Sequence, residues 1–437
     1  MGFLRVLRIR HLAVLWVSQV LSAIGDHLYT IAAIWIAVKV AGSQAGIVGA
    51  AEVGSILVFG LLGGVYADRW NRRTTMIVVD LLRAGAVAVL PILAHAGSLQ
   101  LWHLVVVAVV VGGLESLFEP ALQASLPTLA GDVQTLQATN GLMDVTRRLA
   151  RAIGPSLAGL LITLLPLTHF FTLDAISFVI SAVAVFSLGR RFAWKPARSR
   201  GVVRGVGGVL AEIAGAMRLV RAHRPLLWAL VSNGIINIVW GMAFTIGAAL
   251  LADLVLGGNV GAYGLIVGAY GVGNVLSNLV IGSLTIHRRV MTIFVGKLIL
   301  GAGFLILAFA PTLWVAMLGS ALASVGGPMG DIIMLTMIQT DLPADQIGKI
   351  YSLRMILASA GGALGLLLAV PLFNYLSVPI GITLCALIMA AIGVAGLLRF
   401  GFTEEATPNS RTNRSNSHQG PRHTQYESPN LDDRLAH

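Results

Sequence analysis

The feature that most constrains this chain is a long series of apolar stretches, each long enough to cross a lipid bilayer, separated by polar breaks. An α-helix rises about 1.5 Å per residue, so about 20 apolar residues span the roughly 30 Å hydrocarbon core. A soluble domain carries about 25% charged residues, whereas only 11% of these 437 residues are charged. The pattern therefore excludes a soluble globular protein and predicts an all-α polytopic membrane protein.

The stretches predict twelve membrane-spanning helices. Their expected ranges are 12–40, 44–66, 74–96, 100–124, 138–165, 168–189, 224–252, 260–286, 290–310, 312–340, 346–373 and 377–400. A basic start followed by an apolar run is also typical of a secretory signal peptide, but here the run continues past Asp26 to Val40. That is too long for the core of a signal peptide, so we interpret it as the first membrane helix.

One polar break is much longer than the others and divides the helices into two sets of six. The expected organisation is an N-terminal six-helix bundle at 1–189, a cytoplasmic linker at 190–222, a C-terminal six-helix bundle at 223–402 and a disordered cytoplasmic tail at 403–437. The linker is rich in arginine and glycine, and we expect an amphipathic surface helix around 212–219. The tail is polar with few large apolar residues, a composition typical of disorder.

Lysine and arginine are distributed unevenly between the two sides of the predicted bundle. Alternate breaks and helix starts carry nearly all of them, in the groups Arg5 to Arg10, Arg69 to Arg73, Arg147 to Arg151, Arg190 to Arg224, Arg288 to Arg289 and Lys349 to Arg354. The other side has Lys39. Because basic loops stay in the cytoplasm, this asymmetry predicts a multi-pass protein of the inner or plasma membrane with both termini cytoplasmic. An odd number of helices would destroy the asymmetry.

The two sets of six helices repeat in parallel at an offset of 216 residues. The matching pairs are Gln123-Ala-Ser-Leu-Pro127 with Gln339-Thr-Asp-Leu-Pro343, Arg72-Arg73 with Arg288-Arg289, and Glu115 with Asp331. Each match alone is weak, but agreement of all three at one offset is much less expected by chance. Two related halves of this kind are typical of alternating-access transporters, which bind substrate near the midplane between the halves.

The loop after the second helix resembles the loop signature of the major facilitator superfamily. It reads Gly63-Gly-Val-Tyr-Ala-Asp68-Arg69-Trp-Asn-Arg72-Arg73, with a glycine, a small residue, Asp-Arg and then a basic pair. Gly154-Pro155-Ser-Leu-Ala-Gly159 in the fifth helix is similar to the antiporter motif of drug exporters. It differs from that motif in carrying Ala150 and Ala158 where glycine is preferred.

Further stretches resemble the drug:proton antiporter branch that contains macrolide, tetracycline and enterobactin exporters. They are Ser22-Ala-Ile-Gly-Asp26, Phe118-Glu-Pro-Ala121, Ala138-Thr-Asn140 and the segment from Gln339 to Pro343. The resemblance covers roughly residues 10–400. It implies a monomeric secondary transporter in which inward proton flow drives export of a hydrophobic small molecule, such as a drug or a siderophore-like metabolite. A proton-coupled uptake symporter of the same fold is the alternative.

Acidic side chains inside the predicted helices need an explanation, because burying a charge in a bilayer costs about 2.5–3.5 kcal/mol. In the superfamily, helices 1, 4, 7 and 10 line the cavity, and the resemblance places Asp26, Glu115, Glu119 and Asp331 on those helices. We predict that Asp26, Glu115 and Asp331 couple proton movement to transport, since buried carboxyls can exchange protons as water access alternates. The alternative is structural pairing with a basic residue, for which the candidates are Arg83, Arg151 and Arg354.

A second group of residues is predicted to bind substrate or to assist coupling. It comprises Arg151, Glu119, Asn233, Asn237 and Trp240. Glu119 shares a helix face with Glu115. The uncharged residues of the group, Asn233, Asn237 and Trp240, recur at helical spacing in the seventh helix. Interhelical hydrogen bonding is the alternative for these polar residues. Glu52 and Asp174 are interpreted as structural, and the spacing of Asp80 and Arg83 predicts a local ion pair.

A third group is predicted to gate the transporter. The resemblance implies that Asp68 joins the two halves by contacting the start of the eleventh helix near Arg354, and that Arg69, Arg72 and Arg73 anchor to lipid headgroups or acidic loop residues. Gly154 and Pro155 are expected to bend or closely pack the fifth helix.

The sequence lacks the motifs that define other classes of protein. The sequence has no His-Glu-x-x-His metal site, Gly-x-Ser-x-Gly turn or phosphate-binding loop, so we expect no enzyme, no ATP-driven pump and no cofactor or metal. The single cysteine, Cys385, cannot form an intramolecular disulfide. A channel explains a repeated bundle with buried carboxyl groups less well than an alternating-access transporter does. The expected partners are a small-molecule substrate, protons and the lipid bilayer, not nucleic acid.

Overall fold

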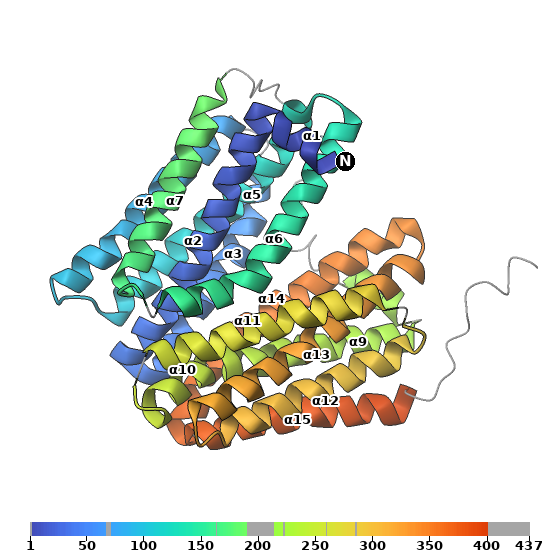
Figure 1. The fold of residues 1–437 in the computed structure, drawn as a ribbon. Helices are drawn as coiled ribbons and strands as arrows, with labels where there is room; N and C mark the ends of the chain where they lie inside the picture. The colour runs from blue at the N-terminus through green and yellow to red at the C-terminus, as the bar shows by residue number, and fades with distance from the viewer. Residues whose placement is uncertain are drawn as a thin grey trace, which may run out of the picture. The chain divides into compact units, whose positions relative to one another are not determined.

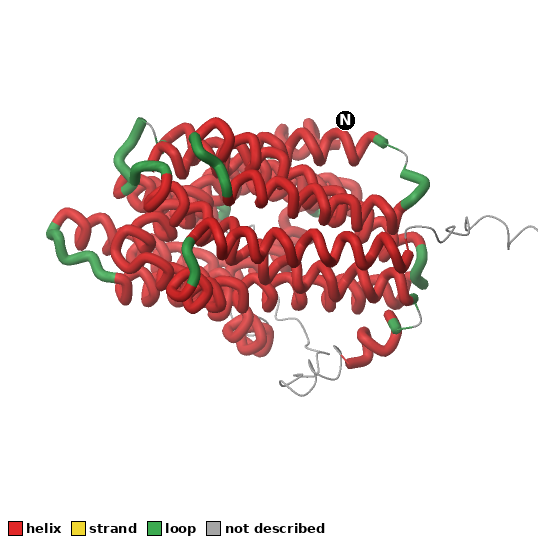
Figure 2. Tube along the Cα trace, turned by 90° about the horizontal axis from the view of Figure 1, so that it is seen from below, coloured by secondary structure: helices red, strands yellow, loops and turns green. Residues whose placement is uncertain are grey.

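A computed structural model describes residues 2–66, 71–162, 164–189, 214–221, 223–258, 260–284 and 286–400. Within these ranges the regular structure is helical, with no strand. Residues Met1–Phe402 form one compact unit. The helices run alongside one another and are joined by short loops at their two ends (Figure 2).

Twelve membrane segments follow one another along the chain (Figure 1). Eleven of them are the helices α2 (Arg10–Ala41), α3 (Gly46–Tyr66), α4 (Arg72–His95), α5 (Leu101–Ala130), α6 (Val133–Leu161), α7 (Thr168–Ser187), α11 (Val260–Ser283), α12 (Arg289–Ala308), α13 (Leu313–Thr340), α14 (Ala344–Tyr375) and α15 (Val378–Phe400). The other is the composite seventh segment, residues 224–255. The predicted all-α fold is confirmed.

By length and apolar composition, ten stretches of the described residues are candidate membrane spans. The first of these, Arg10–Gly60, contains both α2 and most of α3, which a short 3₁₀ turn, η1 (Gly42–Ala45), separates. Helix α6 is not among the ten, although it is as long as its neighbours. It carries Asp144, Arg147, Arg148 and Arg151, and these charges lower its apolar character.

The seventh segment is irregular where the sequence pattern predicts one continuous helix at 224–252. It consists of α9 (Arg224–Trp240), a π-helical stretch η3 (Gly241–Gly247), one turn α10 (Ala248–Leu250) and a second π-helical stretch η4 (Leu251–Val255). Hydropathy cannot distinguish a continuous α-helix from one with π-helical stretches, because both forms keep the backbone hydrogen-bonded within the segment. Such π-helical turns occur frequently at functional sites.

Two short helices lie outside the membrane segments. Helix α1 (Gly2–Arg8) packs on α2 and α6 with Val6 fully buried, and the sequence pattern did not indicate it. Residues 214–220 also form a helix, at the place where an amphipathic surface helix is expected. Its residues Ala216 and Val220 are buried while Arg221 is exposed. Residues 190–213 and 403–437, the rest of the expected linker and the tail, lie outside the described residues.

Close helix packing uses glycine where a side chain has no room. A Cβ atom on Gly296 of α12 would lie 2.8 Å from the carbonyl oxygen of Gly326 on α13. Small residues of this kind let membrane helices approach each other closely, so that dispersion contacts replace the hydrophobic driving force that is absent in lipid.

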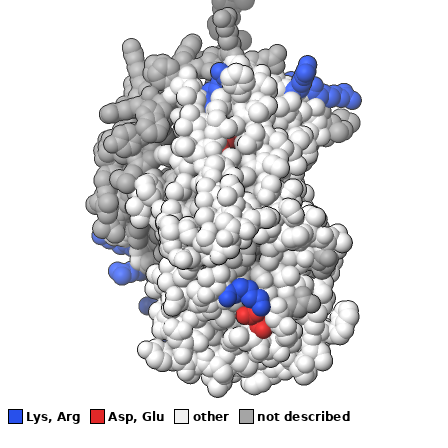
Figure 3. Space-filling view, turned by 90° about the vertical axis from the view of Figure 1, so that its left-hand side faces the viewer, with Lys and Arg blue, Asp and Glu red and all other residues white. Residues whose placement is uncertain are grey.

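Large apolar side chains cover the outside of the assembly, as expected for a lipid-facing surface. Figure 3 shows one face on which uncharged residues predominate, with basic residues near its upper edge and a basic–acidic pair lower down. On α4 and α7, Leu82, Ile92 and Val183 are 53%, 67% and 61% exposed. Such contiguous apolar exposure suits hydrocarbon and not water.

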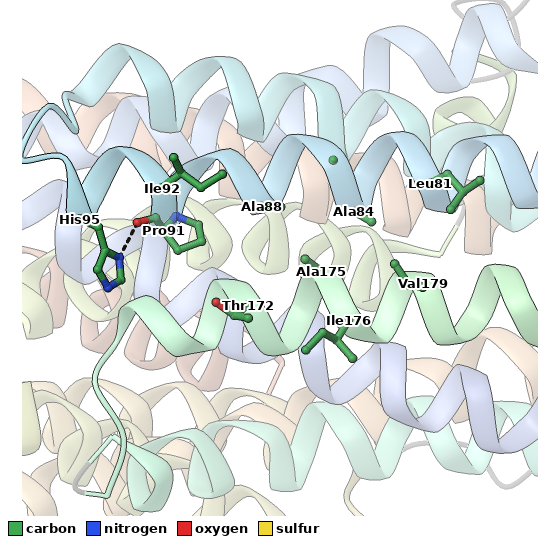
Figure 4. Close-up of a pocket in the computed structure, with 11 residues that line it drawn as sticks. Leu81, Ala84, Ala88, Pro91, Ile92, His95, Thr172, Ala175, Ile176 and Val179 are labelled. Carbon is green, nitrogen blue, oxygen red and sulfur yellow. Dashed lines mark hydrogen bonds between the residues drawn. The ribbon is translucent and has the colours of Figure 1, made fainter.

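A shallow groove of about 840 Å³ lies between α4 and α7 (Figure 4). Its lining is almost entirely apolar and includes Leu81, Ala84, Ile176 and Val179. The ring of His95 at one end bonds through Nδ1 to the carbonyl oxygen of Pro91 at 2.7 Å. Because the groove carries no acidic side chain, it does not coincide with any of the predicted coupling residues.

Candidate proton and substrate site

Arg83 on α4 is the centre of a charged site in the N-terminal half. Its side chain is only 4% exposed, and its Nη2 atom lies 3.5 Å from Asp26 Oδ1 on α2 and 3.7 Å from Glu115 Oε2 on α5. The guanidinium also lies over the Phe178 ring of α7, 4.2 Å from its centroid. Four helices therefore contribute to the surroundings of one buried cation.

The structure thus brings together two of the three predicted proton-coupling residues. It also corrects the predicted local pair between Asp80 and Arg83. Both carboxyl oxygens of Asp80 are buried without a hydrogen-bond partner among the described residues, while Arg83 reaches across the helix interface to Asp26 and Glu115. Spacing within one helix indicates which side chains share a face, but a long arginine side chain can choose a partner on another helix.

The burial of the three charged groups is unequal. Asp26 and Glu115 have side chains that are 42% and 46% exposed, although the arginine that pairs with them is buried. A buried cation inside a membrane needs a counter-ion, and here two acids share this role. Each acid nevertheless keeps an open side, so a proton or a ligand can reach it without disrupting the helix packing.

Asp331 on α13 is also paired, but in the C-terminal half. Its Oδ1 atom accepts a hydrogen bond from Nη2 of Arg354 on α14 at 2.7 Å, with the acid 54% and the arginine 14% exposed. Arg354 therefore contacts a predicted coupling residue. Its expected partner, Asp68, lies outside the described residues, so the predicted gate contact stays a prediction.

The predicted substrate residues of the seventh segment belong to two different arrangements. Asn237 donates through Nδ2 to the carbonyl oxygen of Asn233 at 2.8 Å, a bond within its own helix. Trp240 donates through Nε1 to the Tyr270 hydroxyl on α11 at 2.9 Å. Phe244 lies beside both rings, 5.2 Å from the Trp240 centroid and 4.2 Å from that of Tyr270.

Trp240, Phe244 and Tyr270 form what we call the aromatic cluster. Trp240 and Tyr270 are partly exposed, and Asp331 lies close enough to Tyr270 to act on it electrostatically. Sequence reasoning missed Phe244 and Tyr270. The spacing of four from Trp240 could have indicated Phe244, whereas Tyr270 comes from another helix and only the tertiary structure places it there.

The remaining acidic and basic candidates are placed as follows. Glu119 lies one turn beyond Glu115 and accepts a hydrogen bond from Gln123 Nε2 at 2.8 Å. Arg151 lies within α6, but its side chain is outside the described part of the structure. A role for Arg151 in substrate binding or coupling therefore stays a prediction.

Two of the predicted gating arginines donate hydrogen bonds to backbone oxygens of neighbouring helices, and their anchoring to lipid headgroups or loop acids stays a prediction. Arg72 donates through Nη1 to the carbonyl oxygen of Ala124 on α5, and Arg73 donates through Nη2 to that of Phe186 on α7 at 2.7 Å. Phe186 is close to the end of its helix, where free carbonyls and the helix dipole attract a cation. These two arginines therefore fasten α4 to its neighbours, and Arg69 lies outside the described residues.

Gly154 holds α6 against α2 next to the charged site. A Cβ atom at Gly154 would lie 2.5 Å from Cδ2 of His27, the residue after Asp26. The backbone of α6 is helical through Gly154 and Pro155. Close packing thus explains the glycine, and a gating role for either residue stays a prediction.

At the opposite end of the helices from Arg72 and Arg73, several contacts join the two halves. Lys39 at the end of α2 forms an ion pair with Asp253 in η4, and the Trp35 and Tyr263 rings stack with centroids 5.2 Å apart. Nearby, the Ser43 hydroxyl donates to Asn374 Oδ1 at 2.6 Å. We call these contacts the end clasp, and they close this end of the molecule.

Twelve helical segments in two halves, with ion pairs between membrane helices in each half and contacts that join the halves at one end, define a polytopic membrane transporter of the major facilitator superfamily. The family described as "Transmembrane secretion effector" matches residues 2–422 of the chain, which belongs to this family.

Several proteins of known name are similar along most of their length. Multidrug efflux pump Tap of Mycolicibacterium fortuitum is 29% identical over 397 residues, which cover 85% of this chain and 91% of that protein. Macrolide efflux protein A of Streptococcus pyogenes is 23% identical over 396 residues, covering 87% and 89%. The resemblance to drug exporters that the sequence motifs indicate is thus confirmed.

Solved structures share the fold. An auto-inhibited POT family peptide transporter superposes with a TM-score of 0.68 at 15% identity, covering 92% of this chain and 98% of that one. A bacterial homologue of the human lysosomal transporter Spinster, in an inward-facing and unoccupied conformation, gives 0.62 at 13% identity and covers 90% and 95%. At these identities the likeness concerns the fold alone.

Proposed function

We propose that this protein is a proton-coupled antiporter that exports hydrophobic small molecules, such as drugs or siderophore-like metabolites, by alternating access. The observation that carries the proposal is the shared ion pair in which half-exposed Asp26 and Glu115 neutralise buried Arg83. The names of the relatives, a multidrug and a macrolide efflux pump, support the direction of transport.

The chemistry of coupling follows from charge balance around Arg83. A proton that binds to Asp26 removes one of the two negative charges facing the guanidinium and weakens that attraction. The side-chain contacts that link α2 and α5 to Arg83 of α4 then change, because a buried cation has to find another counter-ion. Each proton that moves inward through the membrane potential supplies about 2.3 kcal/mol per 100 mV, and this energy drives export.

The aromatic cluster and Asp331 together suit a hydrophobic substrate that carries a positive charge. Trp240, Phe244 and Tyr270 offer ring faces for apolar contact and for cation–π attraction. Asp331 offers a carboxylate that is half exposed despite its bond to Arg354. A cationic drug could therefore compete with Arg354 for the same acid.

We further propose that both termini and the arginine-rich helix ends lie in the cytoplasm, in accord with the positive-inside rule. The end clasp then lies on the outer side of the membrane, and the structure corresponds to an inward-facing state. A monomer is the expected functional unit, because the two halves of one chain already enclose the site.

A transport assay in inside-out membrane vesicles tests the function. Vesicles that contain the protein are given an acidic interior and are offered a fluorescent cationic dye, a macrolide or a catecholate siderophore. Antiport predicts that substrate accumulates inside the vesicle and that collapsing the pH gradient with an ionophore abolishes the accumulation. An uptake symporter of the same fold would accumulate substrate in right-side-out vesicles instead, and transport unaffected by the ionophore would refute proton coupling.

A further inference from the structure

Asp174 on α7 is a second acid beside the charged site, and the proposed function does not use it. It is 0% exposed, and its Oδ2 atom has no hydrogen-bond partner among the described residues. The Ser177 hydroxyl donates to the backbone carbonyl oxygen of Asp174 at 2.8 Å, and its oxygen lies 3.5 Å from the other carboxyl oxygen, Oδ1. An ionisable group that is buried in a membrane and so poorly satisfied is costly to retain, which makes a functional role the default interpretation.

The backbone of α2 brings Asp174 next to Asp26. A Cβ atom on Gly25, the residue before Asp26, would lie 2.5 Å from Asp174 Oδ1 and 2.7 Å from the Ser177 hydroxyl. A side chain at position 25 would therefore displace the Asp174 and Ser177 side chains and crowd the backbone of α7, since the Cα atom of Asp174 is 3.2 Å away. Because glycine stands there, the fully buried Asp174 carboxyl lies against α2 one residue before Asp26, whose half-exposed carboxyl faces Arg83.

The groups around Asp174 carry an excess of acid. Those that act on it or on its neighbours are Asp26 and Tyr29 of α2, Glu52 of α3, Asp80 and Arg83 of α4, and Glu115 of α5. Arg83 is the cation common to all of them, and its Nε atom is unpaired within the described structure. Among the described side chains one guanidinium faces five carboxyl groups, and in a low dielectric it cannot neutralise all of them as carboxylates, which favours protons on some of them.

We propose that Asp174 is the occluded proton site of the transport cycle and that Asp26 is its entrance. This inference rests on the proposed antiport. Asp26 takes a proton from water, the proton passes to the neighbouring Asp174 carboxylate, and Asp26 returns to the carboxylate that pairs with Arg83. The O–H bond at Asp26 breaks as the O–H bond at Asp174 forms, so no further reactant is needed. The fully buried site keeps the proton from water while the halves exchange orientation.

The test compares the full-length wild type with Asp174→Asn in reconstituted vesicles, using the same fluorescent cationic dye. Asparagine has nearly the shape of a protonated aspartate, so the variant should fold and should still exchange labelled for unlabelled dye at equal pH. We expect efflux driven by a pH gradient to fall to the rate measured without a gradient. Asp132→Asn, which changes an acid outside the membrane segments, should keep both activities.

Two results would overturn the inference. Gradient-driven efflux with the wild-type pH profile would show that Asp174 is a permanently neutral packing residue. Loss of dye exchange as well as efflux, in a variant that still folds, would assign it to substrate binding. If the wild type itself shows no response to the gradient, the proposed antiport has failed rather than the role of Asp174.

A second variant keeps the test decisive if Asp174→Asn does not fold. Ser177→Ala retains the acid and removes the hydroxyl, which donates to the Asp174 carbonyl oxygen at 2.8 Å and can turn toward Oδ1, 3.5 Å away, when the carboxyl is ionised. Without this donor the ionised carboxyl is less stable, and the proton leaves it less readily. We expect the pH profile of efflux to move to higher pH, and an unchanged profile would contradict a cycling proton at this site.

Discussion

Glu115 and Asp331 occupy equivalent positions 216 residues apart, yet Glu115 pairs with an arginine of the preceding helix and Asp331 with an arginine of the following helix. Glu115 on α5 lies 3.7 Å from Arg83 of the preceding helix, α4. Asp331 on α13 lies 2.7 Å from Arg354 of the following helix, α14. The repeat therefore preserves the acid and not its partner, so the two halves are chemically unequal.

This inequality bears on the division of work between the halves. In the N-terminal half one arginine is shared by two acids, and in the C-terminal half one arginine holds one acid directly. The shared site changes its charge balance whenever one acid binds a proton, which suits coupling. The simple pair lies near the aromatic cluster, which suits substrate binding.

The first prediction concerns Asp26. Asp26→Asn removes the carboxylate that faces Arg83, so we expect gradient-driven efflux to be abolished while the amount of folded protein is unchanged, because Glu115 still neutralises the arginine. Efflux in inside-out vesicles and the yield after gel filtration measure the two effects. Normal proton-driven efflux by this variant would remove Asp26 from the mechanism.

The second prediction concerns the stability contributed by Arg83. Arg83→Met leaves Asp26 and Glu115 facing each other without a cation. Because both acids are half exposed, the cost should be smaller than the about 3–5 kcal/mol typical of breaking a fully buried pair. We expect a clear fall in the unfolding temperature in detergent. The triple variant with Asp26→Asn and Glu115→Gln should recover most of the loss, because it removes the unpaired charges as well. A stable Arg83→Met protein would show that these ion pairs are not structural.

The third prediction concerns the end clasp. Cysteines introduced at Ser43 and Asn374, whose side chains are joined by a 2.6 Å hydrogen bond, should form a disulfide in a Cys385→Ala background. Oxidation should then stop transport and a reductant should restore it, because alternating access requires this end to open. Labelling of free thiols reports the cross-link. Full transport by the oxidised protein would mean that the clasp is not a gate.

The fourth prediction concerns substrate binding by the aromatic cluster. Trp240→Ala removes the ring that contacts Phe244 and Tyr270, and we expect dye affinity to fall by about tenfold, which equals ~1.4 kcal/mol. Trp240→Phe keeps an aromatic face and loses the hydrogen bond to Tyr270, so most of the affinity should remain. Equilibrium binding measured by dye fluorescence compares the two variants. Equal affinity for both and for wild type would place the substrate elsewhere.

The fifth prediction concerns the pH dependence of stability at Asp132, a residue outside the membrane segments. The hydrogen bonds from the Thr135 hydroxyl and backbone N–H to Asp132, which caps α6, hold the pKa of this carboxyl below its usual range. A depressed pKa in the folded state means that the stabilisation is complete above the unfolded-state pKa and is lost as the pH falls through the folded-state value. Asp132→Ala should thus lower the unfolding temperature at neutral pH and have progressively less effect in acid.

Asp132→Asn is the matched control for this prediction, because asparagine also caps a helix but does not titrate. The difference in unfolding temperature between Asp132→Asn and Asp132→Ala should therefore not vary with pH in the acidic range, because neither residue titrates. A pH-independent effect of Asp132→Ala would contradict the contribution of the ionised cap.

The sequence by itself determined the helical architecture. Apolar runs of bilayer length left the chain no alternative to membrane helices, since every backbone polar group must be satisfied within its own segment. The offset of 216 residues and the Asp68 to Arg73 loop then indicated the superfamily. These features are local or periodic, so they can be read without knowing which helices touch.

The tertiary structure alone decided which charges meet. Arg83 lies three residues from Asp80 in the chain, but it pairs with Asp26 and Glu115 on two other helices. Tyr270 enters the aromatic cluster from α11, and Asp253 closes the end clasp from a π-helical turn that hydropathy could not reveal. A long side chain buried in a membrane takes the partner that helix packing places within reach, and that packing depends on close contacts such as the one at Gly25, which no spacing along the chain expresses.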